Sequence, residues 1–316
     1  MSNYRSNLPQ LSGKICITDG GMETDLIFNH QIDLPEFASY DLLRTQQGYE
    51  TLFEYYKVYA KLAQRFKVGL ILETPTWRAN PDWGKKIGDS SESIHHFNLK
   101  SVKLIEHIKA DYETEDTPIV ISGCIGPRGD GYKVESLMSV SEAQQYHATQ
   151  IASFSKTNTD LVSALTLNYV EEAIGITLAA KQYNLPVCIS FTVETDGKLP
   201  TGEILEQAIL TVDQATNNGP VYYMINCAHP THIDHLFNNT EGRWLERLKA
   251  IRCNASCLSH NELDEAEVLD DGNPIAFGIE LGQLKEYSSH ITVLGGCCGT
   301  DHRHIEEVCN NVAVTV

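Results

Sequence analysis

The amino-acid sequence predicts a (β/α)8 TIM barrel, and three observations lead to that fold. Eight short apolar runs recur along the 316 residues, and each is rich in Val and Ile, as expected for strands buried on both faces of a parallel sheet. Longer stretches with helical periodicity separate the runs, which is the alternation of such a barrel. No linker rich in Gly, Pro or Ser divides the chain, so residues 1–316 are expected to form a single domain. A doubly wound open sheet is the alternative, because periodicity does not show whether a sheet closes.

The predicted strands share a near-continuous apolar pattern, and most of them end in small or polar residues. Such endings predict loops that open into solvent or into a pocket. In chain order the strands are Ile15–Gly21, Val68–Thr76, Ile119–Gly126, Asp160–Leu167, Pro186–Val193, Val221–Cys227, Leu248–Asn254 and Ile291–Cys298.

Helices are predicted where apolar residues recur at three- and four-residue spacing, over Tyr49–Phe66, Ser141–Thr157 and Val170–Tyr183. Ser141 and Gln144 have the spacing of a capping box for the second of these helices. Thr300 and Asp301 are expected to cap a final helix through Val308, with the aspartate favourable at its positive end. The acidic segment 254–284 is long for one connection, and we expect an active-site loop, a subunit contact or a solvated excursion.

The charge balance excludes several classes of partner. The chain has 24 Lys and Arg against 42 Asp and Glu, which gives a formal net charge of −18. A protein this acidic lacks the basic face that duplex nucleic acid or an anionic membrane surface requires. No apolar run approaches the roughly 20 residues that span a bilayer. The first residues contain no apolar segment typical of a secretory signal.

The sequence contains nine cysteines, an odd number that cannot be fully paired. Without a secretory signal, we expect a cytoplasmic protein whose thiols stay free, bind metal or take part in chemistry. Cys257 lies in a loop and has no predicted role. Five others are expected to be buried core or helix residues: Cys16, Cys124, Cys188, Cys253 and Cys309.

The remaining three cysteines lie where a barrel carries its chemistry. Cys227 ends the sixth predicted strand, and Cys297 and Cys298 end the eighth. Because the loops at the carboxyl ends of the strands converge in a barrel, three thiolates can meet at one point there. Zinc suits such a sulfur site, and three protein ligands leave the open fourth position of a catalytic zinc centre.

The glycines around Cys297 and Cys298 support this interpretation. Adjacent side chains on a strand point to opposite faces. Both cysteines can therefore bind one ion only if the backbone turns sharply, as Gly295, Gly296 and Gly299 permit. Two alternatives are a phosphate bound at the glycine-rich turn and a redox pair of adjacent cysteines. Zinc is favoured over both.

These motifs resemble those of the homocysteine S-methyltransferase family. The resemblance runs from Asp19-Gly20-Gly21-Met22-Glu23-Thr24 to Gly295-Gly296-Cys297-Cys298-Gly299-Thr300, with the upstream Asn226-Cys227 and a weaker match at Gly123-Cys124-Ile125-Gly126-Pro127. It implies a barrel whose zinc is held by Cys227, Cys297 and Cys298. It also implies transfer of a methyl group from a small onium donor, S-methylmethionine or S-adenosylmethionine, to the thiol of homocysteine, which gives methionine. A thiol bound at zinc loses its proton and becomes a nucleophile near neutral pH.

The resemblance implies a substrate site as well. Asp19 matches an aspartate that helps to bind the amino group of the substrate, and the N–H groups of Gly20 and Gly21 suit its carboxylate. Where many members have a second ammonium-binding glutamate, this chain has Leu165. We therefore predict that Glu73, at the end of the second strand, supplies a replacement carboxylate; the alternative is a partly solvated loop residue.

A second departure lies in the seventh loop. The chain has Asn254-Ala255-Ser256-Cys257 where many members have Asn, a small residue and then Gly. This difference indicates an altered donor side and does not touch the predicted zinc ligands.

Several other functions fit the same residues. The nearest is the same chemistry on a different thiol, and a non-enzymatic zinc-storage or sensing relative would keep the cysteines without the reaction. Outside the family, a barrel lyase or hydrolase would bind a phosphorylated substrate at the GGCCGT turn. No cobalamin- or folate-binding module fits in the remaining length, so the expected partners are a small-molecule thiol and a small methyl donor. The sequence does not indicate an oligomeric state.

Overall fold

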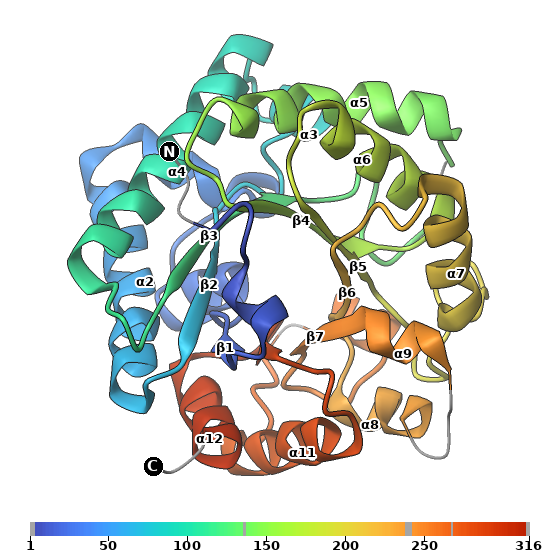
Figure 1. The fold of residues 1–316 in the computed structure, drawn as a ribbon. Coiled ribbons are helices and arrows are strands. Elements are labelled where there is room, and N and C mark those ends of the chain that lie inside the picture. The colour runs from blue at the N-terminus through green and yellow to red at the C-terminus, as the bar shows by residue number, and fades with distance from the viewer. Residues whose placement is uncertain (1–3, 135–136, 238–241, 267, 314–316) are drawn as a thin grey trace.

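The computed structural model describes residues 4–134, 137–237, 242–266 and 268–313. Within these residues, eight parallel strands form a closed barrel in chain order (Figure 1). The closing pair is β8 with β1, where Cys16 lies opposite Val293 on one side and opposite Gly69 of β2 on the other. The (β/α)8 barrel is confirmed, and the open doubly wound sheet is excluded.

Each strand lies inside one of the predicted apolar runs. The runs are longer than the strands because their polar ends leave the sheet and form the loops of the barrel mouth. The strands are β1 (Cys16–Ile17), β2 (Gly69–Glu73), β3 (Ile119–Ile125), β4 (Leu161–Leu167), β5 (Val187–Phe191), β6 (Tyr222–Asn226), β7 (Leu248–Cys253) and β8 (Val293–Gly296).

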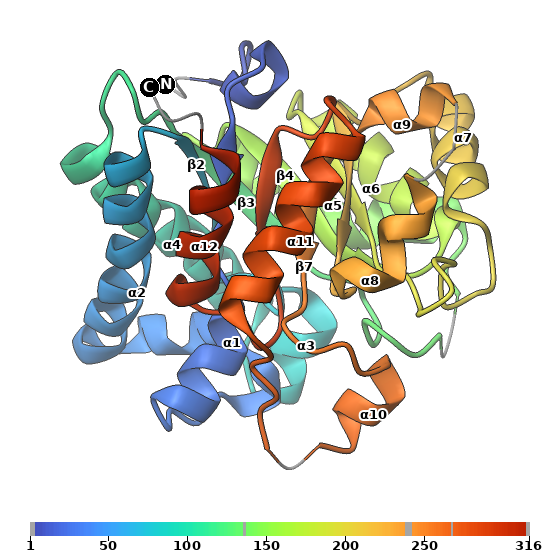
Figure 2. The same ribbon diagram turned by 90° about the horizontal axis from the view of Figure 1, so that it is seen from below.

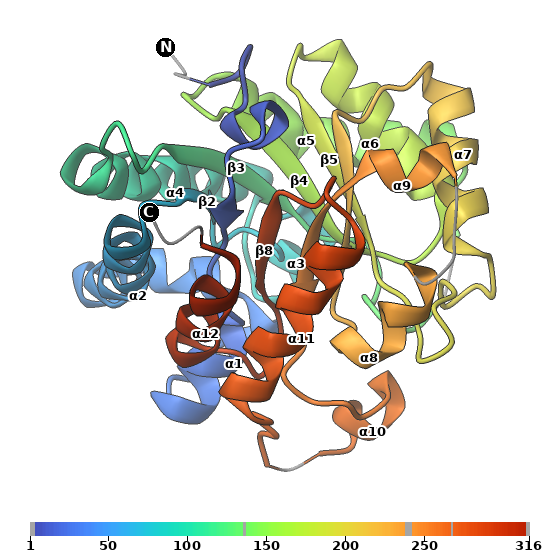
Figure 3. The same ribbon diagram turned by 60° about the horizontal axis from the view of Figure 1, so that its bottom comes forward.

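Helices surround the barrel, and α11 and α12 lie side by side on its outer face (Figure 3). Among the described residues, no helix is both long enough and apolar enough to cross a membrane. The helices are α1 (Met22–Thr24), α2 (Gln46–Phe66), α3 (Pro81–Lys86), α4 (Ser91–Tyr112), α5 (Val140–Ser155), α6 (Val170–Gln182), α7 (Leu205–Thr216), α8 (Pro230–Ile233), α9 (Arg243–Arg247), α10 (His260–Asp264), α11 (Pro274–Tyr287) and α12 (His302–Val312).

The two ends of the barrel differ. Apolar side chains such as Ile71, Val120 and Met224 fill its interior, and Leu8 of the N-terminal segment packs into the same cluster. The segment that carries Leu8 lies at one end of the barrel, whereas α1, α3 and α10 lie at the opposite end (Figure 2). The interior is therefore closed at the amino ends of the strands, and the carboxyl ends are free to form a site.

The predicted cap of α5 is wrong by two residues. Ser139 is the N-cap: its hydroxyl accepts from the N–H of Glu142, and the Glu142 carboxylate accepts from the N–H of Ser139 at 2.8 Å. Ser141 lies inside the first turn. The glutamate is a charged acceptor at the positive helix end, so this box is stronger than one closed by Gln144. The predicted cap of α12 by Asp301 is confirmed, although the helix continues to Val312.

A test of the cap compares two neighbouring serines. Ser139→Ala removes the hydroxyl that satisfies a free N–H, and we expect the free energy of unfolding to fall by about 1 kcal/mol. Ser141→Ala is the matched control, with an expected change below about 0.5 kcal/mol. Urea denaturation followed by circular dichroism measures both. Equal losses for the two variants would contradict the assignment of Ser139 as the cap.

Candidate active site

A cavity of about 450 Å³ opens at the carboxyl ends of the strands. The predicted site residues come from five different strands or the loops after them, and the barrel brings all of them to this cavity. They are Asp19, Gly20, Gly21, Glu73, Leu165, Cys227, Cys297 and Cys298.

The sulfur atoms of Cys227, Cys297 and Cys298 all lie within 4.8 Å of one another. No other group of three metal-ligating side chains gathers in this way within the described part of the chain. Cys227 adopts a left-handed backbone conformation, with φ of 58°, directly after β6. The N–H of Cys297 donates to the carbonyl of Cys253 at 2.7 Å, which holds the turn after β8 against β7.

The glycines of this turn have two different roles. A Cβ atom on Gly295 would lie 1.8 Å from the Thr18 hydroxyl oxygen, and one on Gly296 would lie 2.0 Å from that of Thr300. Neither position has room for a side chain. Gly299 instead has a φ of 79°, the left-handed region that favours glycine. The sharp turn and the close approach predicted for these glycines are both present.

The same turn offers few backbone N–H groups to a phosphate. The N–H groups of Gly296, Cys297, Gly299 and Thr300 donate to Asp19, Cys253, Thr24 and Cys297 respectively. Because these donors are already used inside the protein, the structure does not favour the phosphate interpretation of the GGCCGT turn.

Asn226 was part of the recognised motif, but its contacts could not be predicted from the sequence. Its side-chain amide donates to the sulfur of Cys227 at 3.1 Å and lies 3.8 Å from that of Cys297. The amide oxygen is fixed by the Thr166 N–H at 2.8 Å and the Ser190 hydroxyl at 2.5 Å. Thr166 has a positive φ of 63° beside a bulge of β4. The amide is thus locked with its donor toward the sulfurs.

Two aromatic rings from loops adjoin the cysteines. The hydroxyl of Tyr132 lies 3.5 Å from the sulfur of Cys298. Its ring stacks on His260 of α10 at 4.1 Å between centroids, and the Nε2–H of His260 donates to the Cys227 carbonyl at 2.6 Å. Neither residue carried a recognisable sequence signal, because Tyr132 lies in a loop and His260 begins the short helix α10, both far from Cys298 in sequence.

Hydrogen bonds among the three sulfurs give the three thiols different pKa values. S–H donors from Cys297 and Cys298 lower the pKa of the Cys227 thiol well below its usual range. The same bonds raise the pKa of Cys297 to about 12 and also raise that of Cys298. The cluster therefore stabilises negative charge on sulfur, and three soft donors of this kind suit a thiophilic metal ion.

Asp19 is buried and forms an ion pair that the sequence did not predict. Nη2 of Arg252 lies 2.7 Å from its Oδ1, and the hydroxyl of Tyr55 donates to its Oδ2 at 3.3 Å. Arg252 also donates from Nε to the carbonyl of Gly296 at 3.0 Å. This arginine ties the loop after β1 to the turn after β8. Its signal in the sequence was a cation near the end of the apolar run Leu248–Asn254, which also contains Lys249.

The backbone N–H groups of the two glycines after Asp19 are only partly available to a ligand. The N–H of Gly21 donates to the carbonyl of Thr300 at 2.9 Å. Side chains are excluded here too, because a Cβ on Gly21 would lie 2.3 Å from the carbonyl oxygen of Cys297. The two glycines therefore allow the β1 loop and the β8 turn to pack closely.

Glu73 is buried rather than solvated, with 5% of its surface exposed. Its Oε2 has no hydrogen-bond partner among the described residues. Burial raises the pKa of this carboxyl to about 7, against the opposing charge of Arg252. Leu165 lines the same cavity and contributes only apolar surface. Glu73 is thus a buried carboxyl group that lines the cavity and has one oxygen without a partner among the described residues, which fits the replacement hypothesis.

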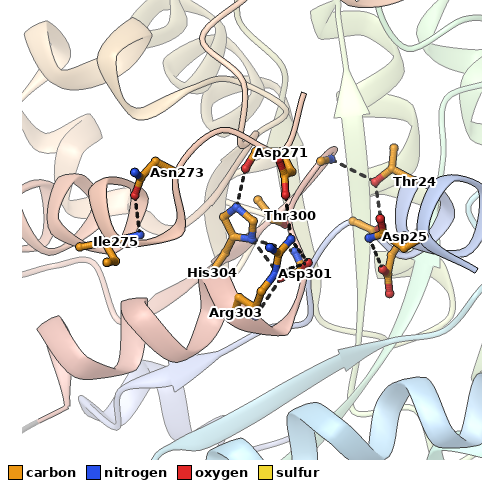
Figure 4. Close-up of polar contacts among 12 residues, drawn as sticks. Thr24, Asp25, Asp271, Asn273, Ile275, Thr300, Asp301, Arg303 and His304 are labelled. Carbon is orange, nitrogen blue, oxygen red and sulfur yellow. Dashed lines mark hydrogen bonds and ion pairs between the residues drawn. The ribbon is translucent and has the colours of Figure 1, made fainter. Parts of the chain in front are cut away.

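Part of the segment 254–284 forms a wall of the cavity. Of the three roles expected for this segment, the structure supports an active-site loop. Residue 267 lies outside the described residues. Leu263, Leu269 and Asp270 line the cavity. Asp271 pairs with Arg303 at 2.8 Å, and its carbonyl accepts from His304 at 2.8 Å, so the segment is attached to the start of α12 (Figure 4).

The other cysteines lie where the sequence predicts. Cys257 is exposed, and all nine cysteines are free thiols. The five expected core residues are buried: Cys16, Cys124, Cys188, Cys253 and Cys309.

Comparisons with known proteins identify solved structures of the same fold and a matching family model. Among solved structures, the chain is similar to the homocysteine methyltransferase MmuM of Escherichia coli. The metallated form has 19% sequence identity and a TM-score of 0.72, with 94% of this chain and 96% of that chain covered. The oxidized form has 18% identity and a TM-score of 0.74, with 97% and 99% covered. These similarities show a shared fold.

No curated protein matches the chain. A family model described as homocysteine S-methyltransferase matches residues 16–312, which is nearly the whole chain. The protein therefore belongs to the homocysteine S-methyltransferase family and is a thiol methyltransferase.

Proposed function

We propose that the protein is a zinc-dependent enzyme that methylates homocysteine from a small onium donor. The observation that carries this proposal is the convergence of the Cys227, Cys297 and Cys298 sulfurs within 4.8 Å. Three sulfur donors match the preference of zinc and leave one coordination position for a substrate. When bound, the ion lowers the pKa of the substrate thiol so that a thiolate is available near neutral pH.

The reaction itself is a direct displacement. The homocysteine sulfur attacks the methyl carbon of the donor, a new S–C bond forms, and the bond between that carbon and the onium centre breaks with its electron pair kept by the donor. The products are methionine and the demethylated donor. No general base from the protein is required in this step, so the role of the cavity is to hold the two reactants in line.

Asn226 and Arg252 prepare the site for this chemistry. The Asn226 amide points a hydrogen-bond donor at Cys227, which stabilises sulfur as thiolate and fixes its direction. Arg252 places a positive charge beside Asp19 and near Cys297. These contacts offset the negative charge that three thiolates bring into a buried site.

The amino-acid part of homocysteine is proposed to lie against the inner wall of the cavity. Glu73 has a free carboxylate oxygen for the ammonium group, in place of the glutamate whose position is taken by Leu165. Asp19 adds a second negative charge, and its oxygens keep lone pairs beyond those used by Arg252 and Tyr55. The loop of Gly20 and Gly21 lies next to both groups and is the proposed place for the substrate carboxylate.

The nearest alternative is the same reaction on another thiol, since only Glu73 and Asp19 argue for an amino-acid acceptor. The free thiols fit a reducing compartment, and we propose a cytoplasmic location for this enzyme.

Metal binding and activity form the first test. The purified protein is expected to contain about one zinc per chain, and to form methionine from homocysteine with S-methylmethionine or S-adenosylmethionine. Cys227→Ser, Cys297→Ser and Cys298→Ser should each lose the metal and the activity. Cys257→Ser is the control, since Cys257 is exposed, and should keep both.

Metal analysis and a methionine assay separate the alternatives. A metal-free protein with full activity would reject the zinc proposal. A zinc-loaded protein that methylates no thiol would instead favour the storage or sensing alternative, and a small panel of other thiols identifies a different acceptor.

The raised pKa of Glu73 gives a pH test. The neutral carboxylic acid cannot pair with an ammonium group, so ligand affinity should increase as the pH rises through about 7. Methionine is a suitable probe, because it has the ammonium group but no ionisable thiol. Its dissociation constant, measured by calorimetry, should fall by up to about tenfold between about pH 6 and about pH 8.

In the Glu73→Gln variant, methionine should bind about 10- to 100-fold more weakly at about pH 8, and the dependence on pH should disappear. Glu280→Gln is the matched control, because burial also raises the pKa of Glu280 but this residue does not line the cavity. Unchanged binding in Glu73→Gln would rule out Glu73 as the ammonium site.

A further inference from the structure

Arg78 is a buried cation that the mechanism described above does not use. It follows β2, lines the cavity and is only 7% exposed. Its guanidinium carbon lies 3.9 Å from the ring centre of Trp77 and 3.5 Å from that of Trp83. The two indoles hold the planar group in one orientation. Burial lowers the pKa of Arg78 to about 10, so the side chain stays positively charged at neutral pH.

Within the described residues, this guanidinium has no carboxylate partner. Nη1 donates to the carbonyl of Gly129 at 3.2 Å, and the buried Nε has no acceptor there. Asp130 and Glu23 act on it only through electrostatic attraction without a hydrogen bond. By contrast, the buried Arg252 has Asp19 at 2.7 Å. A buried charge without a partner is costly, which indicates a place prepared for an anionic group.

The surroundings of Arg78 distinguish it from the inner wall of the cavity. The acidic groups that influence Arg78 lie in the mouth loops and include Asp130, Glu23 and Glu36. Those that influence Arg252 are Asp19, Glu73 and Cys297. A thiol at the three cysteines would therefore have Arg252 and Glu73 beside its amino-acid part, whereas Arg78 lies in the loop after β2, beyond the strand end that carries Glu73, and lines the same cavity.

The segments after β1 and β2 also have side chains that favour an onium group. Phe28, Phe37 and Trp77 line the cavity together with Met22. Aromatic faces attract sulfonium and quaternary ammonium cations through the cation–π interaction. A positive guanidinium beside these rings would repel a donor that is only cationic. It would attract a donor that carries a carboxylate at a distance from its onium centre.

We infer that Arg78 binds the carboxylate of the methyl donor, and that the enzyme selects onium donors that carry such a carboxylate. This inference rests on the proposed function, because it needs a methyl donor in the cavity. It adds a recognition residue for the carboxylate that both proposed donors, S-methylmethionine and S-adenosylmethionine, carry. The planar fork of the arginine suits two parallel hydrogen bonds to a carboxylate.

The test compares two donors in steady-state kinetics. S-methylmethionine carries the carboxylate, and trimethylsulfonium lacks it. In Arg78→Gln, the preference for S-methylmethionine, expressed as the ratio of the two kcat/KM values, should fall about 10- to 100-fold. Arg78→Lys keeps the charge but loses the fork and should give an intermediate ratio. Arg128→Gln, at an arginine already paired with Asp82 and absent from the cavity lining, is the control and should keep the parental ratio.

The KM for homocysteine shows whether Arg78 binds the carboxylate of the donor or that of the acceptor. A change below about twofold, within the scatter of a surface substitution, supports the donor assignment. A large rise in this KM with an unchanged donor ratio would overturn it in favour of the acceptor carboxylate. An unchanged ratio and an unchanged KM would mean that Arg78 only packs between the indoles, which would also overturn the inference.

A measurement on the unaltered protein covers the case in which Arg78→Gln does not fold. Calorimetry should show S-methylmethionine binding at least about tenfold more tightly than its carboxamide, in which the charge is removed. Equal affinities would overturn the inference without any variant. Failure of the parent enzyme to use either donor would instead count against the proposed function, so the two failures are distinguishable.

Discussion

Closure of the barrel between β8 and β1 is the constraint on which the site depends. The pairing of these strands brings residues near both ends of the chain to one place, with the turn after β8 packed against the loop after β1. Gly295 and Gly296 have no room for a Cβ because Thr18 and Thr300 lie so close. Without this contact, Cys297 and Cys298 would not face Cys227 across the end of β7.

Buried charged side chains are the second feature that shapes the site at the mouth of the barrel. Asp19 and Arg252 neutralise each other, and in doing so they join the loop after β1 to the turn after β8. Glu73 and Arg78 are different, since neither forms an ion pair within the described residues and each also keeps a buried polar atom without a partner. A folded protein retains such groups at a cost in stability, and two of opposite sign in one cavity match the opposite charges of zwitterionic ligands.

The sequence allowed the fold to be predicted well, because strands buried on both faces of a parallel barrel have a distinctive apolar composition. All eight strands lie inside the predicted runs. The three cysteines were also predictable, because strand ends converge in a barrel. The cap of α5 was misplaced because Ser139 and Ser141 both have a partner three residues later, and only the geometry of the turn separates them.

The remaining parts of the site depend on tertiary contacts. Nothing in the sequence says that Arg252 reaches Asp19, that Asn226 is locked by Thr166, or that Arg78 lies between two indoles. Each of these contacts joins residues from different strands or loops. Their partners are set by the register and curvature of the closed sheet, which local patterns do not encode.

The closed end of the barrel has a consequence for the order of events. Leu8 and the interior side chains fill the barrel at the amino ends of the strands, so ligands enter and leave through one mouth. The thiol and the donor of the proposed reaction therefore share this one opening, and the demethylated donor and methionine leave by the way that their precursors entered.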